Sequence, residues 1–515
     1  MGKRNDLLHF MLMTIRRQPK TITENVVWNF LGQGWLFVLA LVATPFIIRQ
    51  LGVDLYGIYV LIAIVIDYFA FLQFGVGTAA VKYVAEHLSR GDAEGVRDTF
   101  WTGMILHGAM GCLGMLLIFA FSEFLIDRLF NVPPPARSTA VAVLRIGSVG
   151  FLISMVIVLA GGAIRAAGRF DLLNGMSILL GTLQIASAVI LLYRGYELSD
   201  VVLSNVVIQG VGLGLHGCCV ARLYPFLGSP RWNKGVFRQL LRFGGFVTLS
   251  GVIGPILSDV EKLFITSLRS VSALAYYAVP FSLMSRLSVL PSAFSAVLFP
   301  AISALHGSNN REAIRDLYRR STLYLLLLYS APLTFFLFFG GPFLSLWVGP
   351  DFAEQSTVVL WILGFAGLVN AAAYPASTVL QGLGKPQWPA LFHLAELVLY
   401  LPAGFLLIGT YGIKGAAAAW LLRVSMDTVL LHGAALHLLG ERRWTWCMAL
   451  ARRGLPPLIL NTLLFVTLRS FGWALLDPLN LAGMAMATAG YATVLWKWVL
   501  DPGLRGQFAS ILQRY

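Results

Sequence analysis

Eight ionisable side chains of this sequence lie within apolar stretches that are long enough to cross a lipid bilayer. They are the cations Arg145, Lys262, Arg286 and Arg423 and the acids Asp67, Glu261, Glu396 and Asp427. A charge in hydrocarbon is costly, so such residues commonly mark a binding site or an ion pathway. Arginine makes bidentate charged hydrogen bonds to phosphate groups, and a buried carboxylate can bind a proton or a sodium ion. We therefore predict that the cations bind a phosphate or diphosphate and that the acids couple transport to an ion.

Some of these charges could instead neutralise one another. Asp259 and Lys262 are three residues apart and Arg423 and Asp427 are four apart, so each pair can meet on one helix face. Arg145 and Arg286 have no opposite charge within four residues of their own helix, so each needs a partner from another helix, water or an anionic ligand. His393, three residues before Glu396, is a weaker candidate, because a lone histidine in a span more commonly packs as a hydrogen-bonding residue.

The composition defines the class of protein. Of 515 residues, 57% are hydrophobic and 12% charged, and the mean hydropathy is +0.76. Since about 20 apolar residues span a bilayer, we predict an all-α integral membrane protein with fourteen transmembrane helices. These cover roughly residues 26–48, 56–80, 99–121, 139–161, 172–193, 199–221, 243–264, 275–301, 321–341, 356–380, 389–409, 415–438, 456–475 and 479–498.

The segments between these spans are too short for a catalytic domain outside the membrane. No nucleotide-binding loop is present, because Gly384-Lys385 is followed by Pro386. The four cysteines have neither disulfide nor metal spacing. We therefore expect a transporter that is not an enzyme, has no cofactor and no metal site, and is at most coupled to protons or sodium ions.

The distribution of positive charge predicts the orientation. The formal net charge is +14, and alternation through fourteen spans places most lysines and arginines on the side of the N-terminus. This positive-inside bias puts both termini in the cytoplasm. The expected counter-charge is anionic lipid rather than nucleic acid. Residues 1–25 are predicted to form an interfacial cytoplasmic segment.

The two halves of the chain resemble each other at a shift of about 217 residues. The fragment "GDAEGVRDTF" matches "NNREAIRDLY", and "AIRAAGRF" matches "VLQGLGKP". We predict an N-lobe (26–222), a basic cytoplasmic linker (223–242), a C-lobe (243–438) and an appendix of two helices with a cytoplasmic tail (439–515). With six spans each, the lobes would be related by a pseudo-two-fold axis along the membrane normal and could rock to give alternating access.

Three further expectations follow from this arrangement. Asp67 corresponds to Ser285, beside Arg286, so Asp67 and Arg286 are predicted to pair between the lobes. Prolines at 255, 280, 291 and 300 make spans seven and eight the expected place for bending. The segments 82–98 and 302–320 have apolar residues at helical spacing with charges of both signs, so each is predicted to be a cytoplasmic amphipathic helix.

Several motifs carry a family resemblance. The opening "NFLGQGWLFVLALVATPFIIRQLGVDLYGIYVL" (29–61) contains Asn29, Pro45, Leu51-Gly52 and Tyr56-Gly57 and leads to "FGVGTAAVKYVAE". The second half contains "GLGKP" at 382–386 and "YGIKGAAAAWLL" at 411–422. Across its whole length the chain resembles the polysaccharide transporters, the O-antigen and exopolysaccharide lipid flippases of the multidrug/oligosaccharidyl-lipid/polysaccharide exporter superfamily.

The resemblance implies a flippase in the bacterial inner membrane. It would move an undecaprenyl-diphosphate-linked oligosaccharide from the inner to the outer leaflet for O-antigen, capsule or exopolysaccharide biosynthesis, through a cationic central cavity. A monomeric transport unit is expected, with glycan polymerase and chain-length proteins as possible partners. The alternatives are a drug or cation antiporter or a peptidoglycan-precursor flippase of the same superfamily, or a membrane-embedded polysaccharide polymerase or ligase.

Overall fold

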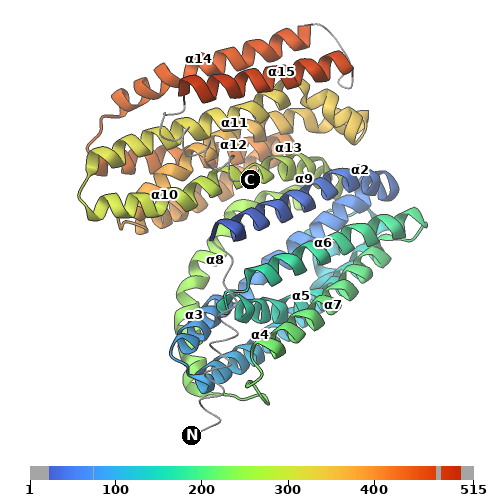
Figure 1. Cartoon of the computed structure of the whole chain (residues 1–515). Helices are drawn as coiled ribbons and strands as arrows, with labels where there is room; N and C mark the ends of the chain where they lie inside the picture. The colour runs from blue at the N-terminus through green and yellow to red at the C-terminus, as the bar shows by residue number, and fades with distance from the viewer. Residues whose placement is uncertain (1–21, 74, 471–476, 500–515) are drawn as a thin grey trace. The chain divides into compact units, whose positions relative to one another are not determined.

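The computed structural model describes residues 22–73, 75–470 and 477–499, and the regular structure in these ranges is helical, without strands (Figure 1). The all-α prediction is therefore confirmed for the described part of the chain. The predicted interfacial segment lies almost wholly outside it. The fourteen described α-helices are α2 (Ile22–Phe69), α3 (Val76–Ser89), α4 (Ala93–Phe124), α5 (Arg137–Ala166), α6 (Phe170–Tyr193), α7 (Leu198–Leu223), α8 (Lys234–Leu268), α9 (Val271–Arg286), α10 (Val289–Gly307), α11 (Arg311–Trp347), α12 (Pro350–Gly382), α13 (Gln387–Leu439), α14 (Arg443–Ser470) and α15 (Pro478–Val494).

Helices and predicted spans do not correspond one to one. In the described ranges nine helical segments are long and apolar enough to cross a membrane. Two of them, Gly32–Gln73 and Gln387–Leu439, have 42 and 53 residues. At a rise of about 1.5 Å per residue each is long enough for two crossings of a hydrocarbon layer about 30 Å thick. Each also contains one non-helical glycine, Gly52 or Gly412, between two predicted spans. Predicted spans seven, thirteen and fourteen fall on α8, α14 and α15, which are not among the nine.

The two predicted amphipathic helices are wrong in the same way. Segment 82–98 contains the end of α3, a turn at Gly91 with φ +66°, and the start of α4. Segment 302–320 contains the end of α10, a turn at Asn309 with φ +56°, and the start of α11. Asp92 caps the N-terminus of α4 and Asn310 caps that of α11. Each side chain accepts a hydrogen bond from the backbone N–H three residues further on. The recurrence of this turn supports the internal repeat.

The chain divides into two compact units, Met1–Ala275 and Tyr276–Tyr515. This division falls within α9, beyond the linker that the sequence predicts, because α8 packs on α2, α3 and α4. In unit 1, α5 packs against α4 and α7, and α2 against α6. In unit 2, α12 packs against α11 and α13, α14 against α11, and α15 against α14.

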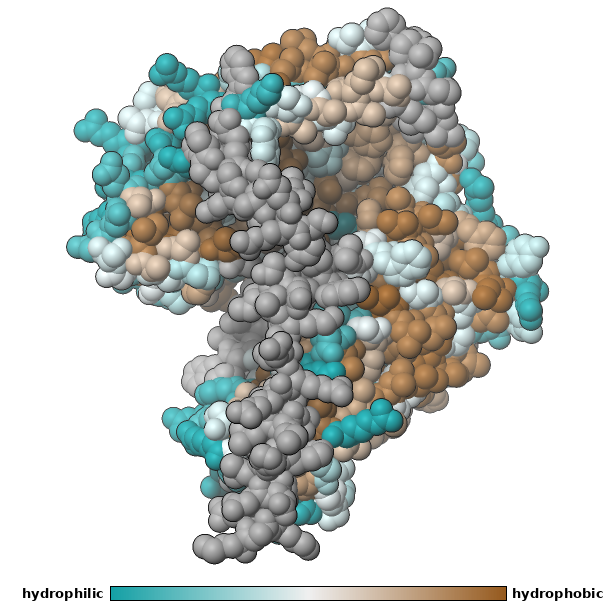
Figure 2. Space-filling model, viewed as in Figure 1, coloured by the Kyte–Doolittle hydropathy of each residue, from teal (hydrophilic) through white to brown (hydrophobic). Residues whose placement is uncertain are grey.

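Apolar side chains cover much of the outer surface. Figure 2 shows hydrophobic residues over broad parts of the visible face, as expected for helices that contact lipid. Leu116, Val207, Leu406 and Val429 are each exposed by more than half of their surface. Hydrophilic residues gather at the end of unit 2 where α10 meets α11 and α13 meets α14.

Candidate functional site

The break in α13 brings buried charged side chains of unit 2 together. Gly412 has φ +60° and ψ −136°, a conformation that is essentially restricted to glycine. Close by, a Cβ added at Gly415 would lie 1.9 Å from the carbonyl oxygen of Leu407. These glycines let the chain fold back, so that residues before and after the break meet.

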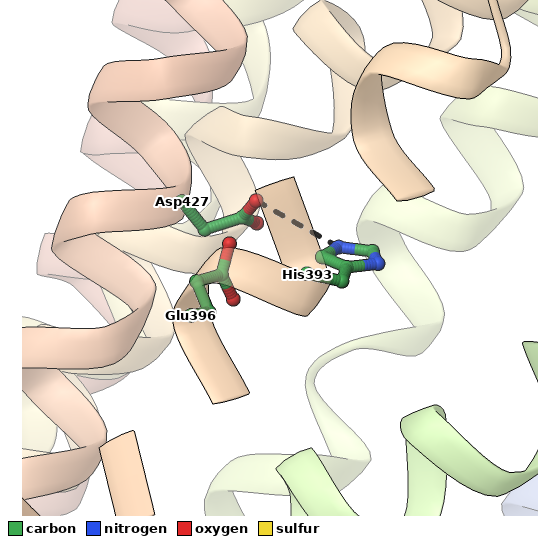
Figure 3. A group of neighbouring side chains, drawn as sticks. All are labelled: His393, Glu396 and Asp427. Carbon is green, nitrogen blue, oxygen red and sulfur yellow. Dashed lines mark ion pairs between the residues drawn. The ribbon is translucent and has the colours of Figure 1, made fainter. Parts of the chain in front are cut away.

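Four charged or titratable residues meet across this fold. His393 and Glu396 share one face of the first half of α13, and Arg423 and Asp427 share one face of the second half. Arg423 Nη1 lies 3.5 Å from Glu396 Oε2, and His393 Nε2 lies 3.7 Å from Asp427 Oδ1. Figure 3 shows Glu396 and Asp427 close together, with the His393 ring directed at Asp427.

The two carboxylates of this site are buried, yet several polar atoms of the site have no hydrogen bond. Glu396 is 0% and Asp427 6% exposed. With both carboxylates ionised, Glu396 Oε1, Asp427 Oδ1 and Arg423 Nε form no hydrogen bond with the residues that the structure describes. Polar atoms left like this in a low-dielectric interior are costly, which makes the site receptive to a ligand. The Arg423 guanidinium also lies 5.8 Å from the ring centre of Tyr400 and 5.9 Å from that of Trp420.

The charges at this site balance only when one further positive charge, a proton or a cation, is bound to its two carboxylates. With both carboxylates ionised and the imidazole neutral, Arg423 compensates one of the two negative charges. One carboxylate oxygen each from Glu396 and Asp427 and one ring nitrogen of His393 lie within 4.8 Å of one another. Carboxylate oxygens bind hard cations. A carboxylate and an imidazole can each accept a proton. The arrangement can therefore bind a proton or a single cation.

A second charged group lies in unit 1. Lys262 of α8 forms an ion pair with Asp259, as their spacing predicts. Asp67, near the end of α2, is close enough to interact electrostatically with both. Glu261 lies in the same turn and is 0% exposed. Two of the predicted residues, Asp67 and Lys262, are thus brought together.

Arg145 has an ion-pair partner on a neighbouring helix. The sequence predicts such a partner, because no opposite charge lies near Arg145 on its own helix. Its Nη2 donates to Glu123 Oε1 at 2.8 Å, and its Nε donates to Ser122 Oγ at 3.1 Å. The guanidinium also lies 4.9 Å from the ring centre of Phe119. Its charge is therefore compensated from α4.

Arg286 is the exception among the four predicted cations. It is exposed, and it forms no ion pair with any described residue of unit 2. It ends α9, and the chain turns through Leu287 and Ser288 before α10 begins. The span predicted at 275–301 is thus interrupted, within the region where bending is expected. The predicted pairing of Arg286 with Asp67 joins two separate units and stays a prediction.

Sequence reasoning located the carboxylates but missed two features of the site. It ranked His393 low, although its ring contacts Asp427. The spacing of Arg423 and Asp427 allows them to pair along one helix, whereas in the structure Arg423 pairs with Glu396. A clue lay in the sequence, since Gly412 and Gly415 interrupt the apolar run between the two halves.

Solved structures with a similar fold are membrane transporters. The chain matches an inward-facing multidrug resistance MATE-family transporter of the MOP superfamily with a TM-score of 0.66 at 14% identity, over 84% of this chain and 97% of the other. An outward-facing one matches with a TM-score of 0.57 at 14% identity, over 83% and 97%. The chain therefore has the MATE-like transporter fold and is a multi-pass membrane protein.

The family follows from the sequence comparison. A model of the family described as "Polysaccharide biosynthesis protein" matches residues 46–355, more than half of the chain, so this protein belongs to that family. A "Putative O-antigen transporter" of Shigella flexneri is 24% identical over 80% of this chain and 97% of its own length. "Probable flippase AglR" of Haloferax volcanii is 22% identical over 79% and 80%. The resemblance seen in the sequence is confirmed at the level of the family.

Proposed function

We propose that this protein is a flippase that moves a polyprenyl-diphosphate-linked oligosaccharide from the inner to the outer leaflet of the cytoplasmic membrane. The observation that carries the proposal is membership of the polysaccharide biosynthesis family, together with relatives named as an O-antigen transporter and a flippase. The product would serve O-antigen, capsule or exopolysaccharide assembly. Both termini would lie in the cytoplasm, and transport would proceed by alternating access.

A protein route is needed for physical reasons. Each sugar hydroxyl that enters hydrocarbon without a hydrogen-bond partner costs several kcal/mol, so an oligosaccharide does not cross unaided. A polar pathway between helices lets the head group cross while the polyprenyl chain stays in lipid. This part of the proposal requires polar groups at membrane depth, and the described spans contain them.

The diphosphate site rests first on Arg286. Arg145, Lys262 and Arg423 have carboxylate partners, whereas Arg286 has none among the described residues of unit 2. Arg286 lies where α9 stops and α10 has not begun. Interrupted membrane helices commonly form substrate sites, because polar backbone is tolerated there only beside a cavity or protein. The other three cations would join only if their carboxylate partners release them.

The driving ion would bind at His393, Glu396 and Asp427. Their unbalanced charge and unbonded oxygens support cation or proton binding. Binding of one positive charge would neutralise the site. After its release, Arg423 alone would compensate the two carboxylates, through its ion pair with Glu396. Asp67 and Glu261 of unit 1 are the second proposed ion-binding group.

The experiment is a complementation test of Arg286→Ala. In the source cell with its own gene deleted, wild-type protein should restore surface polysaccharide and Arg286→Ala should not, at equal abundance in the membrane. Arg194→Ala is the matched control, since Arg194 is an exposed arginine just after α6. Normal export by Arg286→Ala would remove this residue from the substrate site.

A cation exporter is the second candidate, and the excess of acid at Glu396 and Asp427 is what favours it. It predicts that deletion of the gene sensitises cells to cationic drugs without altering surface polysaccharide. The flippase proposal predicts the reverse.

A further inference from the structure

The first turns of α8 in unit 1 carry three cations that have no counter-charge nearby. Lys234, Arg238 and Arg242 follow one another at intervals of four residues, so they lie along one side of the helix at steps of about 6 Å. All three side chains are exposed. None of them forms an ion pair or a hydrogen bond with a residue of unit 1 that the structure describes. These three residues are called the basic face below.

The other side of the same turns is packed against unit 1. Leu240 is 0% exposed, and it belongs to a hydrophobic cluster that α8 shares with α3, α4 and α5. Val236, Phe237 and Leu241 pack against the same cluster. The start of α8 lies beside α3, at the end of unit 1 where α4 begins (Figure 1). This packing fixes the rotation of the helix about its axis, so the basic face is held toward the surroundings of the protein.

The acids at this end of unit 1 already have partners. Among the side chains that the structure describes at the α3–α4 and α5–α6 turns and at the start of α4, the ion pairs are Glu86 with Arg90, Asp92 with His87, Glu94 and Asp98 with Arg231, and Asp171 with Arg169. The ends of the chain carry no excess of acid either. Residues 1–21 contain five lysines and arginines and one acid, and residues 500–515 contain two arginines and one acid. The basic face therefore attracts an anion from outside the chain.

The depth of the basic face favours lipid phosphate over a soluble partner. The apolar span predicted at 243–264 begins directly after Arg242. Head groups extend about 5–7 Å beyond the hydrocarbon on each side of a bilayer, so Arg242 and Arg238 lie at the depth of the lipid phosphates. Trp232, just before α8, is 46% exposed, and its ring centre lies 5.0 Å from that of Phe237. Exposed indole rings of this kind are enriched at the membrane–water interface.

We propose that the basic face binds the phosphate groups of anionic phospholipids, of which phosphatidylglycerol is the simplest, at the membrane surface. The guanidinium groups of Arg238 and Arg242 can each donate two hydrogen bonds to phosphate oxygens. Lys234 adds a positive charge one turn further from the hydrocarbon. Lipid bound here would hold the start of α8, the helix that leads from unit 1 toward α9, at the membrane surface. The site takes lipid whatever cargo the protein carries, so it is independent of the proposed function.

The test is native mass spectrometry of the purified full chain in a neutral detergent with increasing phosphatidylglycerol or phosphatidylcholine. We expect phosphatidylglycerol to bind more tightly than phosphatidylcholine. Arg238→Gln should weaken phosphatidylglycerol binding about fivefold, and Lys234→Gln/Arg238→Gln/Arg242→Gln should weaken it about a hundredfold. Arg238→Lys, which keeps the charge, should retain most of the affinity. The matched control is Arg194→Gln, which removes an exposed arginine just after α6 and should leave binding unchanged.

The thermal unfolding midpoint in lipid-free detergent shows whether each variant is folded. We expect unchanged midpoints because the substituted side chains are exposed, and Arg238→Gln decides alone if the triple variant is unstable. Equal affinity for the two lipids, or full phosphatidylglycerol affinity in these variants, would overturn the proposal. Tighter binding of undecaprenyl diphosphate than of phosphatidylglycerol, lost in the triple variant, would assign the basic face to the transported lipid instead. Displacement of phosphatidylglycerol by a soluble octaglutamate peptide would assign it to an acidic protein.

Discussion

Replacing Arg423 by leucine should destabilise this protein more than replacing Arg423 and Glu396 together. The two charged atoms are 3.5 Å apart, and their side chains are 11% and 0% exposed. At an effective dielectric constant of about 20, the attraction between the two charges at this distance is about 5 kcal/mol. Part of this attraction offsets the cost of removing both charged groups from water. Breaking a buried pair leaves one uncompensated charge and costs about 3–5 kcal/mol. Because Glu396 would then face Asp427 without a cation, we expect the single variant to lose about 3 kcal/mol.

The assay is a double-mutant cycle. Wild type, Arg423→Leu, Glu396→Gln and the double variant are unfolded at equilibrium in mixed micelles with increasing sodium dodecyl sulfate. The expected coupling energy is about 2–3 kcal/mol. The control cycle uses Glu86 and Arg90, an ion pair of 2.6 Å whose side chains are 37% and 67% exposed, and such pairs contribute about 0.3–0.5 kcal/mol. A coupling energy at Glu396–Arg423 no larger than in this control would refute the reasoning.

Three further predictions concern the helices that support the sites. Gly412→Ala should lower the free energy of unfolding by about 1–3 kcal/mol through its positive φ, and the control Gly409→Ala should change it little. Tyr491→Phe should cost about 1 kcal/mol, because the buried hydroxyl donates to Leu327 O at 3.0 Å; an unchanged midpoint in the same micelle titration would contradict this. The backbone N–H of Gly95 and the imidazole of His87 hold the pKa of Asp92 below its usual range. Its cap on α4 is therefore fully effective above the unfolded-state pKa of about 3.9 and is lost as the pH falls through the folded-state pKa. Asp92→Asn should keep the cap and remove this acid-dependent loss in thermal unfolding below about pH 4, whereas an unaltered pH profile would show that Asp92 does not cause it.

The helical class of the protein could be predicted because it depends on composition. A chain with 57% hydrophobic and 12% charged residues can satisfy its backbone in lipid only by forming helices or a closed barrel. The i, i+3 pair of Asp259 and Lys262 could also be predicted, since it depends on helix geometry alone. The ends of the helices were harder to predict from the sequence. Gly91 and Asn309 lie in turns between helices, inside segments whose apolar spacing continues across the turn.

Contacts between residues far apart in the chain could not be predicted from the sequence. Glu123, the partner of Arg145, lies in α4 outside any predicted span, so nothing local indicated it. His393 meets Asp427 only because α13 folds back at Gly412, and the apolar pattern on either side does not specify how the two halves are aligned. For the same reason the sequence could not show that Arg423 pairs with Glu396 and not with Asp427.

The most direct test of the central claim is flipping in reconstituted vesicles. Fluorescent undecaprenyl-diphosphate-linked oligosaccharide is placed in both leaflets, and an impermeant quencher reports the fraction that reaches the outer leaflet over time. Wild-type protein should move the lipid faster than protein-free vesicles do, and an imposed proton or sodium gradient should accelerate it. Glu396→Gln should lose this acceleration, whereas Arg194→Ala should retain it. Equal rates in vesicles with and without the wild-type protein, with or without a gradient, would contradict the account.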